Sequence, residues 1–160
     1  MKEYYILHKP YGMLSQFSKE LEQHQSLADL NLPFKKDIYP VGRLDKDSEG
    51  LLILSNDKAL TDKLLNPLHQ HQRSYWVQVE GIPTVQALQM LQTDLQIKIK
   101  KKIHQCLPAD AFILENAPLA ARNPPIRFRK NIATTWLSIT LTEGKNRQVR
   151  RMTAKIGYPT

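Results

Sequence analysis

The chain has 160 residues, of which 41% are hydrophobic and 24% are charged. That length suits one domain, or two small subdomains sharing a core, and the composition argues against wholesale disorder. No apolar run reaches the roughly 20 residues that a bilayer crossing needs, and the early charges argue against a signal peptide. The single cysteine, Cys106, excludes an internal disulfide and a multi-cysteine zinc site. We therefore expect a cytoplasmic protein in which Cys106 is reduced and partly buried.

The positive charge is concentrated in one segment near the C-terminus. The net charge is +8, from 23 Lys+Arg against 15 Asp+Glu. Residues 1–121 hold equal numbers of basic and acidic residues, whereas residues 122–155 hold nine basic residues and one acid, Glu143. A neutral body with one basic segment is typical of a surface that binds phosphates, and a solvated basic face is the plain alternative.

In chain order, the first half alternates short apolar runs with turn-forming segments. Residues 4–8 predict a strand that ends at the turn Lys9-Pro10-Tyr11-Gly12, and residues 13–17 are expected to extend as a second strand. Residues 18–37 are polar and mixed, which predicts a surface segment with one helical turn. Residues 51–54 predict a buried strand. The cluster Ser55-Asn56-Asp57 then predicts the start of a helix that ends at Pro67, with an inward face of Leu60, Leu64 and Leu65.

The second half begins with a clear alternation over residues 74–81, which predicts a half-buried strand. A helix is expected after Pro83-Thr84, with Val85, Leu88 and Leu91 inward. Strands are expected at 97–99, 103–107, 111–114 and 134–143, with a loop at 123–125. A turn at Gly144 precedes a helix over 145–156 with Val149, Met152 and Ile156 inward. The sum predicts an α+β fold, a mixed and mostly antiparallel sheet with flanking helices.

Two motifs that resemble metal sites are set aside. The stretch 45–50 has the acidic spacing that opens a calcium loop, but its twelfth position is Asn56 and its flanks are strand-like. The pair His69-x-His71 has no third ligand in view, so a polar loop explains it better. Phosphate-loop and dinucleotide-binding glycine motifs are also absent from the sequence.

The remaining constellation centres on Asp45, which lies in Gly42-Arg43-Leu44-Asp45 at a turn before a buried strand. A carboxylate that acts as a base or nucleophile at neutral pH must stay ionised while it is poorly hydrated, and a fixed cation achieves this. Arg150 is the best candidate, because it follows Val149 at the buried edge of the expected C-terminal helix. Tyr75, on the apolar face of its strand, suits either core packing or stacking on a nucleobase.

Four segments of the sequence resemble the pseudouridine synthases, specifically the branch that modifies single uridines of ribosomal RNA. They are 8–12 (His-Lys-Pro-Tyr-Gly), 42–57 (beginning Gly-Arg-Leu-Asp), 74–79 (the tyrosine-bearing strand) and 137–152 (containing Glu-Gly-Lys-Asn-Arg-Gln-Val-Arg-Arg-Met). They occur in the order of the family. The chain starts directly at the catalytic domain, and residues 122–127 resemble those of one subgroup of this branch, which acts on the large ribosomal subunit. The resemblance implies that the substrate is a uridine in 23S ribosomal RNA.

The resemblance implies one catalytic domain over residues 1–160, or two subdomains around a cleft, without a small N-terminal RNA-binding module and with a shortened C-terminus. It also implies an isomerase that breaks the bond from uracil N1 to the ribose, rotates the base and rejoins it through C5. No cofactor, metal or membrane is expected, and a monomer is the default. The implied catalytic residues are Asp45, Tyr75 and Arg150. The implied RNA contacts are Arg43, Lys9, Arg127, Arg129, Lys145, Arg147 and Arg151.

Two departures and two rival functions accompany this prediction. Lys145 stands where the family usually has arginine, and Ser48 replaces the commoner threonine.

One rival function is a non-catalytic RNA-binding or ribosome-assembly protein that uses only the basic segment. The other is an RNA-cleaving or glycosidase-like enzyme with two carboxylates, for which Asp47 and Glu49 are the available second acids.

Overall fold

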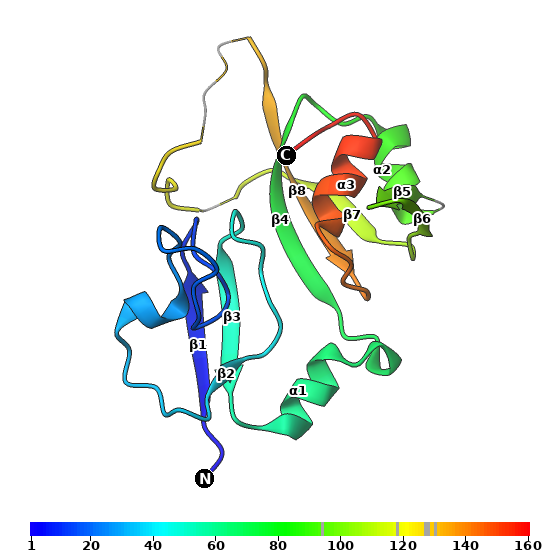
Figure 1. The fold of residues 1–160 in the computed structure, drawn as a ribbon. Coiled ribbons are helices and arrows are strands. Elements are labelled where there is room, and N and C mark those ends of the chain that lie inside the picture. The colour runs from blue at the N-terminus through cyan, green and yellow to red at the C-terminus, as the bar shows by residue number, and fades with distance from the viewer. Residues whose placement is uncertain (94, 118, 127–128, 130) are drawn as a thin grey trace. The chain divides into compact units, whose positions relative to one another are not determined.

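The computed structural model describes residues 1–93, 95–117, 119–126, 129 and 131–160. The chain divides into two compact units (Figure 1). Unit 1 comprises Met1–His69 and Arg122–Ile126, and unit 2 comprises Gln70–Ala121 and Arg127–Thr160. Each unit has a hydrophobic core of its own, in place of the shared core expected from the length of the chain. Across the described residues, no helix combines the length and apolarity needed to span a membrane.

Unit 1 is built on a three-stranded antiparallel sheet. Its strands are β1 (Tyr4–Lys9), β3 (Gly50–Ser55) and β2 (Tyr39–Pro40), in the order β1-β3-β2. Side chains alternate along β1, so that every second residue faces the core and the others are exposed. Lys9 is the last residue of β1 and pairs with Gly50, the first residue of β3. The expected strands at 4–8 and 51–54 are therefore confirmed.

The segment between β1 and β2 covers this sheet. Met13, Leu27 and Ile38 are buried against Leu52 and Leu54 of β3. The predicted strand over 13–17 is wrong. Instead, Met13 forms an isolated bridge to Gln25, because no neighbouring run of extended chain continues the pairing. The predicted helical turn is confirmed as the 3₁₀ helix η1 (Leu27–Leu30), which Ser26 and Asp29 cap.

Helix α1 (Lys58–Leu65) follows β3 and is succeeded by the short 3₁₀ helix η2 (Pro67–His69). Asp57 caps α1, as the sequence predicts, because its carboxylate accepts the Ala59 amide at 3.0 Å. The expected inward face is only half-buried, with Leu65 39% exposed. Residues 122–126 join unit 1 through the Arg122 guanidinium, which lies 3.9 Å from the centre of the Tyr11 ring.

Unit 2 is built on a second antiparallel sheet, in which the central strand is β8 (Thr134–Leu141). It lies between β4 (Arg73–Glu80) and β7 (Asp110–Leu114). The alternation predicted from the sequence is confirmed, since Leu137 and Ile139 are fully buried and Val79 is 1% exposed. These side chains form the centre of the unit 2 core.

Two helices and a hairpin cover one face of this sheet (Figure 1): α2 (Val85–Gln92), α3 (Gln148–Lys155), and β5 (Gln96–Ile99) paired with β6 (Lys102–Gln105). The predicted inward face of α3 is confirmed by the buried Met152 and Ile156. The predicted face of α2 is partly wrong. Leu91 is buried as predicted, but Val85 is 67% exposed and Ala87 lies in the core in its place.

Candidate active site

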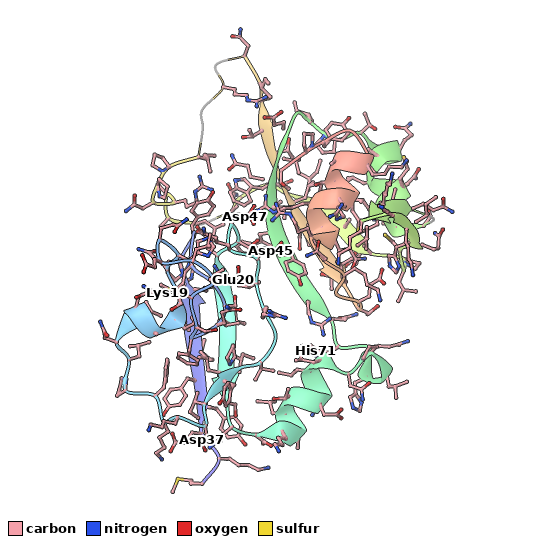
Figure 2. The ribbon with its side chains drawn as sticks, viewed as in Figure 1. Lys19, Glu20, Asp37, Asp45, Asp47 and His71 are labelled. Atoms are coloured by element: carbon pink, nitrogen blue, oxygen red, sulfur yellow. The ribbon has the colours of Figure 1, made fainter. Side chains whose placement is uncertain are left out.

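Asp45 lies in loop 41–49, which leads into β3. Figure 2 shows Asp45 and Asp47 at the end of the unit 1 sheet where β1 ends and β3 begins, with Asp37 at the opposite end. The Asp45 side chain is half-buried, and the Asp45 carbonyl accepts the Ser48 amide at 3.0 Å in a tight turn. Gly42 and Gly50, before and after Asp45, have φ of +84° and +120°, which side chains disfavour. The loop therefore presents a carboxylate from a rigid sheet edge.

The end of β1 and the chain that follows it hold this loop in place through Lys9, Gly12 and Ser15. The Gly12 amide donates to the Lys46 carbonyl at 2.8 Å. Ser15 bonds both backbone groups of Leu44, and the Lys9 ammonium reaches the Lys46 carbonyl at 3.5 Å. Asp45 thus lies between two residues whose backbone is tied to the segment 9–15.

Lys9 does not fit its expected role as an RNA contact. It is fully buried, and its ammonium donates to the carbonyls of Met13 at 2.8 Å and Pro10 at 2.9 Å. Burial lowers the pKa of Lys9, while the nearby carboxylates, led by Asp47 and Glu49, act in the opposite direction. The prediction that Lys9 contacts phosphate is corrected to a structural role, because no part of its side chain is accessible to RNA.

Arg43 is exposed, two residues before Asp45. It lines a surface cavity of about 580 Å³ in unit 1, together with Ser15, Tyr39 and Leu65 among others. A guanidinium in this position is accessible to an incoming RNA. Its contact with RNA stays a prediction.

Tyr75 lies on β4 opposite Ile139 of β8. It is half-buried and packs against the unit 2 core on the same face as Val77 and Val79. The predicted face of this strand is confirmed. The stacking of Tyr75 on a nucleobase stays a prediction.

Arg150 is half-buried on α3, and its guanidinium donates to the Thr160 hydroxyl at 3.2 Å. Asp45 belongs to unit 1, whereas Tyr75 and Arg150 belong to unit 2. The ion pair expected between Asp45 and Arg150 stays a prediction.

The basic segment has members with different surroundings. Lys145 and Arg147 are exposed just before α3, and Arg147 has a left-handed backbone with φ of +51°. The Arg151 guanidinium makes hydrogen bonds within the protein, because it donates to the backbone carbonyls of Lys98 at 2.8 Å and Asn146 at 3.1 Å. Two further predicted RNA contacts lie nearby in the sequence. Arg129 forms an exposed ion pair with Glu80 at 3.0 Å, and Arg127 lies outside the described residues.

A hydrogen-bond network around Glu143 fixes the approach to α3, and sequence reasoning missed it. One carboxylate oxygen accepts from the Gln148 amide nitrogen at 2.6 Å and from the Leu107 backbone amide at 2.9 Å. The other lies 2.9 Å from His104 Nε2. Gln148 in turn accepts the Lys145 backbone amide at 2.9 Å. The available signal was that Glu143 is the single acid in the basic segment 122–155.

His104, Cys106 and Glu143 also bring three potential metal ligands within 4.8 Å of one another. Zinc accepts donors of these three kinds. Here, however, both Glu143 oxygens already have hydrogen-bond partners from the protein. Burial raises the pKa of the Cys106 thiol, and the Glu143 charge adds to this effect. The network therefore accounts for the positions of His104 and Glu143.

The comparisons with known proteins agree in pointing to one family. Residues 3–155 match the model of the family described as RNA pseudouridylate synthase. The chain is 50% identical over 155 residues to ribosomal large subunit pseudouridine synthase E of Vibrio vulnificus, covering 97% of this chain and 63% of that protein. It is 46% identical over 157 residues to the synthase E of Xanthomonas axonopodis pv. citri, covering 97% and 80%.

A solved structure extends this likeness to the fold. A crystal structure of a pseudouridylate synthase superposes with a TM-score of 0.75 at 20% identity, covering 99% of this chain and 59% of that one. The expected α+β fold is thereby confirmed. The chain spans less than two thirds of the length of the Vibrio vulnificus relative. With its sequence matched from residue 3 to residue 155, the chain belongs to the RNA pseudouridylate synthase family.

Proposed function

We propose that this chain isomerises a specific uridine of 23S ribosomal RNA to pseudouridine, with Asp45 as the catalytic carboxylate. The observation that carries the proposal is the half-buried Asp45 on loop 41–49, in a chain that matches the family over residues 3–155. The names of the relatives in Vibrio vulnificus and Xanthomonas axonopodis, which refer to the large ribosomal subunit, favour 23S RNA as the substrate. We further expect the protein to act in the cytoplasm as a monomer.

The reaction balances without an external reactant. The bond between N1 of uracil and C1′ of the ribose breaks, the detached base rotates, and a bond from C5 to C1′ forms. The proton on C5 is released, and N1 gains a proton. The enzyme must hold the free uracil beside the ribose through this exchange, and avoiding the entropy of separation is part of the catalysis.

Four residues have distinct roles in this proposal. Asp45 starts cleavage, either by attack or by taking a proton from the sugar, and Arg150 keeps it ionised and oriented. Tyr75 stacks on the uracil. Because a base inside structured RNA is inaccessible, the uridine must first be flipped out, which costs a few kcal/mol. Arg43, exposed in loop 41–49, fills the gap that the base leaves.

The basic segment supplies the binding energy for the RNA backbone. Lys145 and Arg147 are exposed and suit phosphate contacts, and Arg127, Arg129 and Arg151 are proposed to add to them. Contacts of this kind release counterions, so the affinity should fall steeply as salt rises.

The direct test is to incubate fragments of 23S RNA with the chain and map pseudouridine by chemical labelling. The proposal expects one modified uridine with the wild type and none with Asp45→Asn. Salt-dependent RNA binding without any pseudouridine would favour the non-catalytic RNA-binding protein. Strand scission or base loss would favour an RNA-cleaving or glycosidase-like enzyme. Either result would overturn the proposal.

A further inference from the structure

Ser15 bonds to both backbone groups of the residue that precedes Asp45. Its hydroxyl donates to the Leu44 carbonyl at 2.8 Å and accepts from the Leu44 amide at 3.0 Å. The side chain of Ser15 is almost completely buried, with 4% of the residue exposed. A contact between residues 29 positions apart therefore joins the chain after β1 to loop 41–49.

The chemistry of this bridge fixes the orientation of the backbone at Asp45. The Leu44 carbonyl belongs to the planar peptide group that also contains the Asp45 nitrogen. A hydrogen bond that holds the carbonyl therefore sets the plane from which Asp45 projects. Because the same hydroxyl also holds the Leu44 amide, rotation of Leu44 about its own backbone bonds is restrained on both sides.

The other side of Asp45 is anchored by contacts that do not involve Ser15. The Gly12 amide donates to the Lys46 carbonyl at 2.8 Å, and this is a contact between two main chains. Ser15 is therefore the side chain whose truncation releases one flank of Asp45 and leaves the other in place.

We infer that Ser15 is a positioning residue that orients Asp45 for the reaction, an inference that rests on the proposed function. Ser15 acts through Leu44. Because a displacement of about 1 Å in a reacting group can cost about 100-fold in rate, a looser Leu44 should lower kcat while leaving RNA binding almost unchanged.

The experiment compares Ser15→Ala with Ser26→Ala. Ser26 is the matched control because it is also a fully buried serine of unit 1, with its hydroxyl on the Phe17 carbonyl at 3.0 Å. Each substitution removes one buried hydroxyl that bonds to the backbone. We expect Ser15→Ala to lower kcat by about 10-fold or more with KM within about 3-fold, and Ser26→Ala to keep kcat within about 2-fold.

A second variant and a second readout make the result decisive. Ser15→Cys keeps a side chain of similar shape with a weaker donor and acceptor, so its kcat should lie between those of the wild type and Ser15→Ala. Hydrogen exchange of the Leu44 amide should accelerate in the Ser15 variants and stay unchanged in Ser26→Ala. The exchange measurement reports the bridge without any reference to activity.

Two outcomes would overturn the inference. One is a Ser15→Ala enzyme whose kcat equals that of Ser26→Ala. The other is unchanged exchange of the Leu44 amide in the Ser15 variants. Failure of the proposed function looks different, because the wild type would then form no pseudouridine, or Asp45→Asn would stay active.

Discussion

The Lys9 ammonium donates a hydrogen bond to the Met13 carbonyl at 2.8 Å, at a position with no solvent exposure. A buried charge is costly unless it is well solvated by other groups. Here, backbone carbonyls replace water, with the Pro10 carbonyl at 2.9 Å as a second acceptor. Lys9 thereby closes the turn after β1 and contributes to the anchoring of loop 41–49.

Lys9→Met should destabilise unit 1 without weakening RNA binding. Methionine fills similar space but donates nothing, so the Met13 and Pro10 carbonyls lose a charged partner. The expected loss is about 1–3 kcal/mol in the free energy of unfolding, measured by urea denaturation. The exposed Lys36→Met is the control and should stay within about 0.5 kcal/mol of the wild type. Unchanged stability together with a large loss of RNA affinity would restore Lys9 as a phosphate contact.

Asp57 makes the stability of unit 1 depend on pH in the acid range. Its carboxylate accepts from the Tyr4 hydroxyl at 2.8 Å and from Lys2 at 3.1 Å, and it caps α1. These partners lower the pKa of Asp57 from 3.8 to about 2, with the Tyr4 hydrogen bond as the largest cause. Because the folded pKa lies below the unfolded one, the stabilisation is fully present above about pH 4 and is lost as the pH falls towards 2.

Asp57→Asn should therefore flatten the loss of stability between pH 4 and pH 2. Thermal unfolding of the wild type and the variant across pH 2–6 measures this difference. The wild type should lose its advantage over Asp57→Asn as the pH falls through this range. The control is the exposed Asp110→Asn, which should lose stability below pH 4 as steeply as the wild type does. An equally steep loss of stability below pH 4 in the wild type and in Asp57→Asn would contradict this role of Asp57.

Glu143→Ala should destabilise unit 2, because it leaves the Leu107 amide and the Gln148 side chain without their acceptor. The expected loss in the free energy of unfolding is about 2–3 kcal/mol, since hydrogen bonds to a charged group are stronger than neutral ones. Chemical denaturation measures the loss. Glu115→Ala, at an exposed position, should leave the stability unchanged. A Glu143→Ala protein as stable as Glu115→Ala would show that the network contributes nothing.

Strand β8 and the C-terminal helix could be predicted because their apolar residues fall regularly on one face. Leu137 and Ile139 alternate with polar residues along β8, and Met152 of α3 and Ile156 at its C-terminal cap recur at helical spacing. Helix α2 is apolar at five of its eight positions, around more than one face, so its pattern did not settle which face is inward, and Val85 is exposed. Short elements take their orientation from the core against which they pack.

The features that the sequence could not supply depend on contacts that only the folded chain makes. A lysine is expected at the surface, and only the folded turn after β1 shows that Lys9 is enclosed by carbonyls. The Ser15–Leu44 bridge and the Glu143–Leu107 bond likewise join residues 29 and 36 positions apart. Asp45 itself was identified from its motif, because the flanking glycines and the following apolar run mark the loop and the strand.

The central claim is that Asp45 starts the cleavage of the glycosidic bond, and release of the C5 hydrogen tests it most directly. With 23S RNA fragments carrying tritium at uracil C5, the wild type should release tritium to water as C5 bonds to the ribose. Asp45→Asn should release none above background while it binds the RNA within a few fold of the wild type. Asp37→Asn, at the opposite end of the sheet, should release tritium at the wild-type rate. Release by Asp45→Asn at a rate comparable to that of Asp37→Asn would contradict the claim.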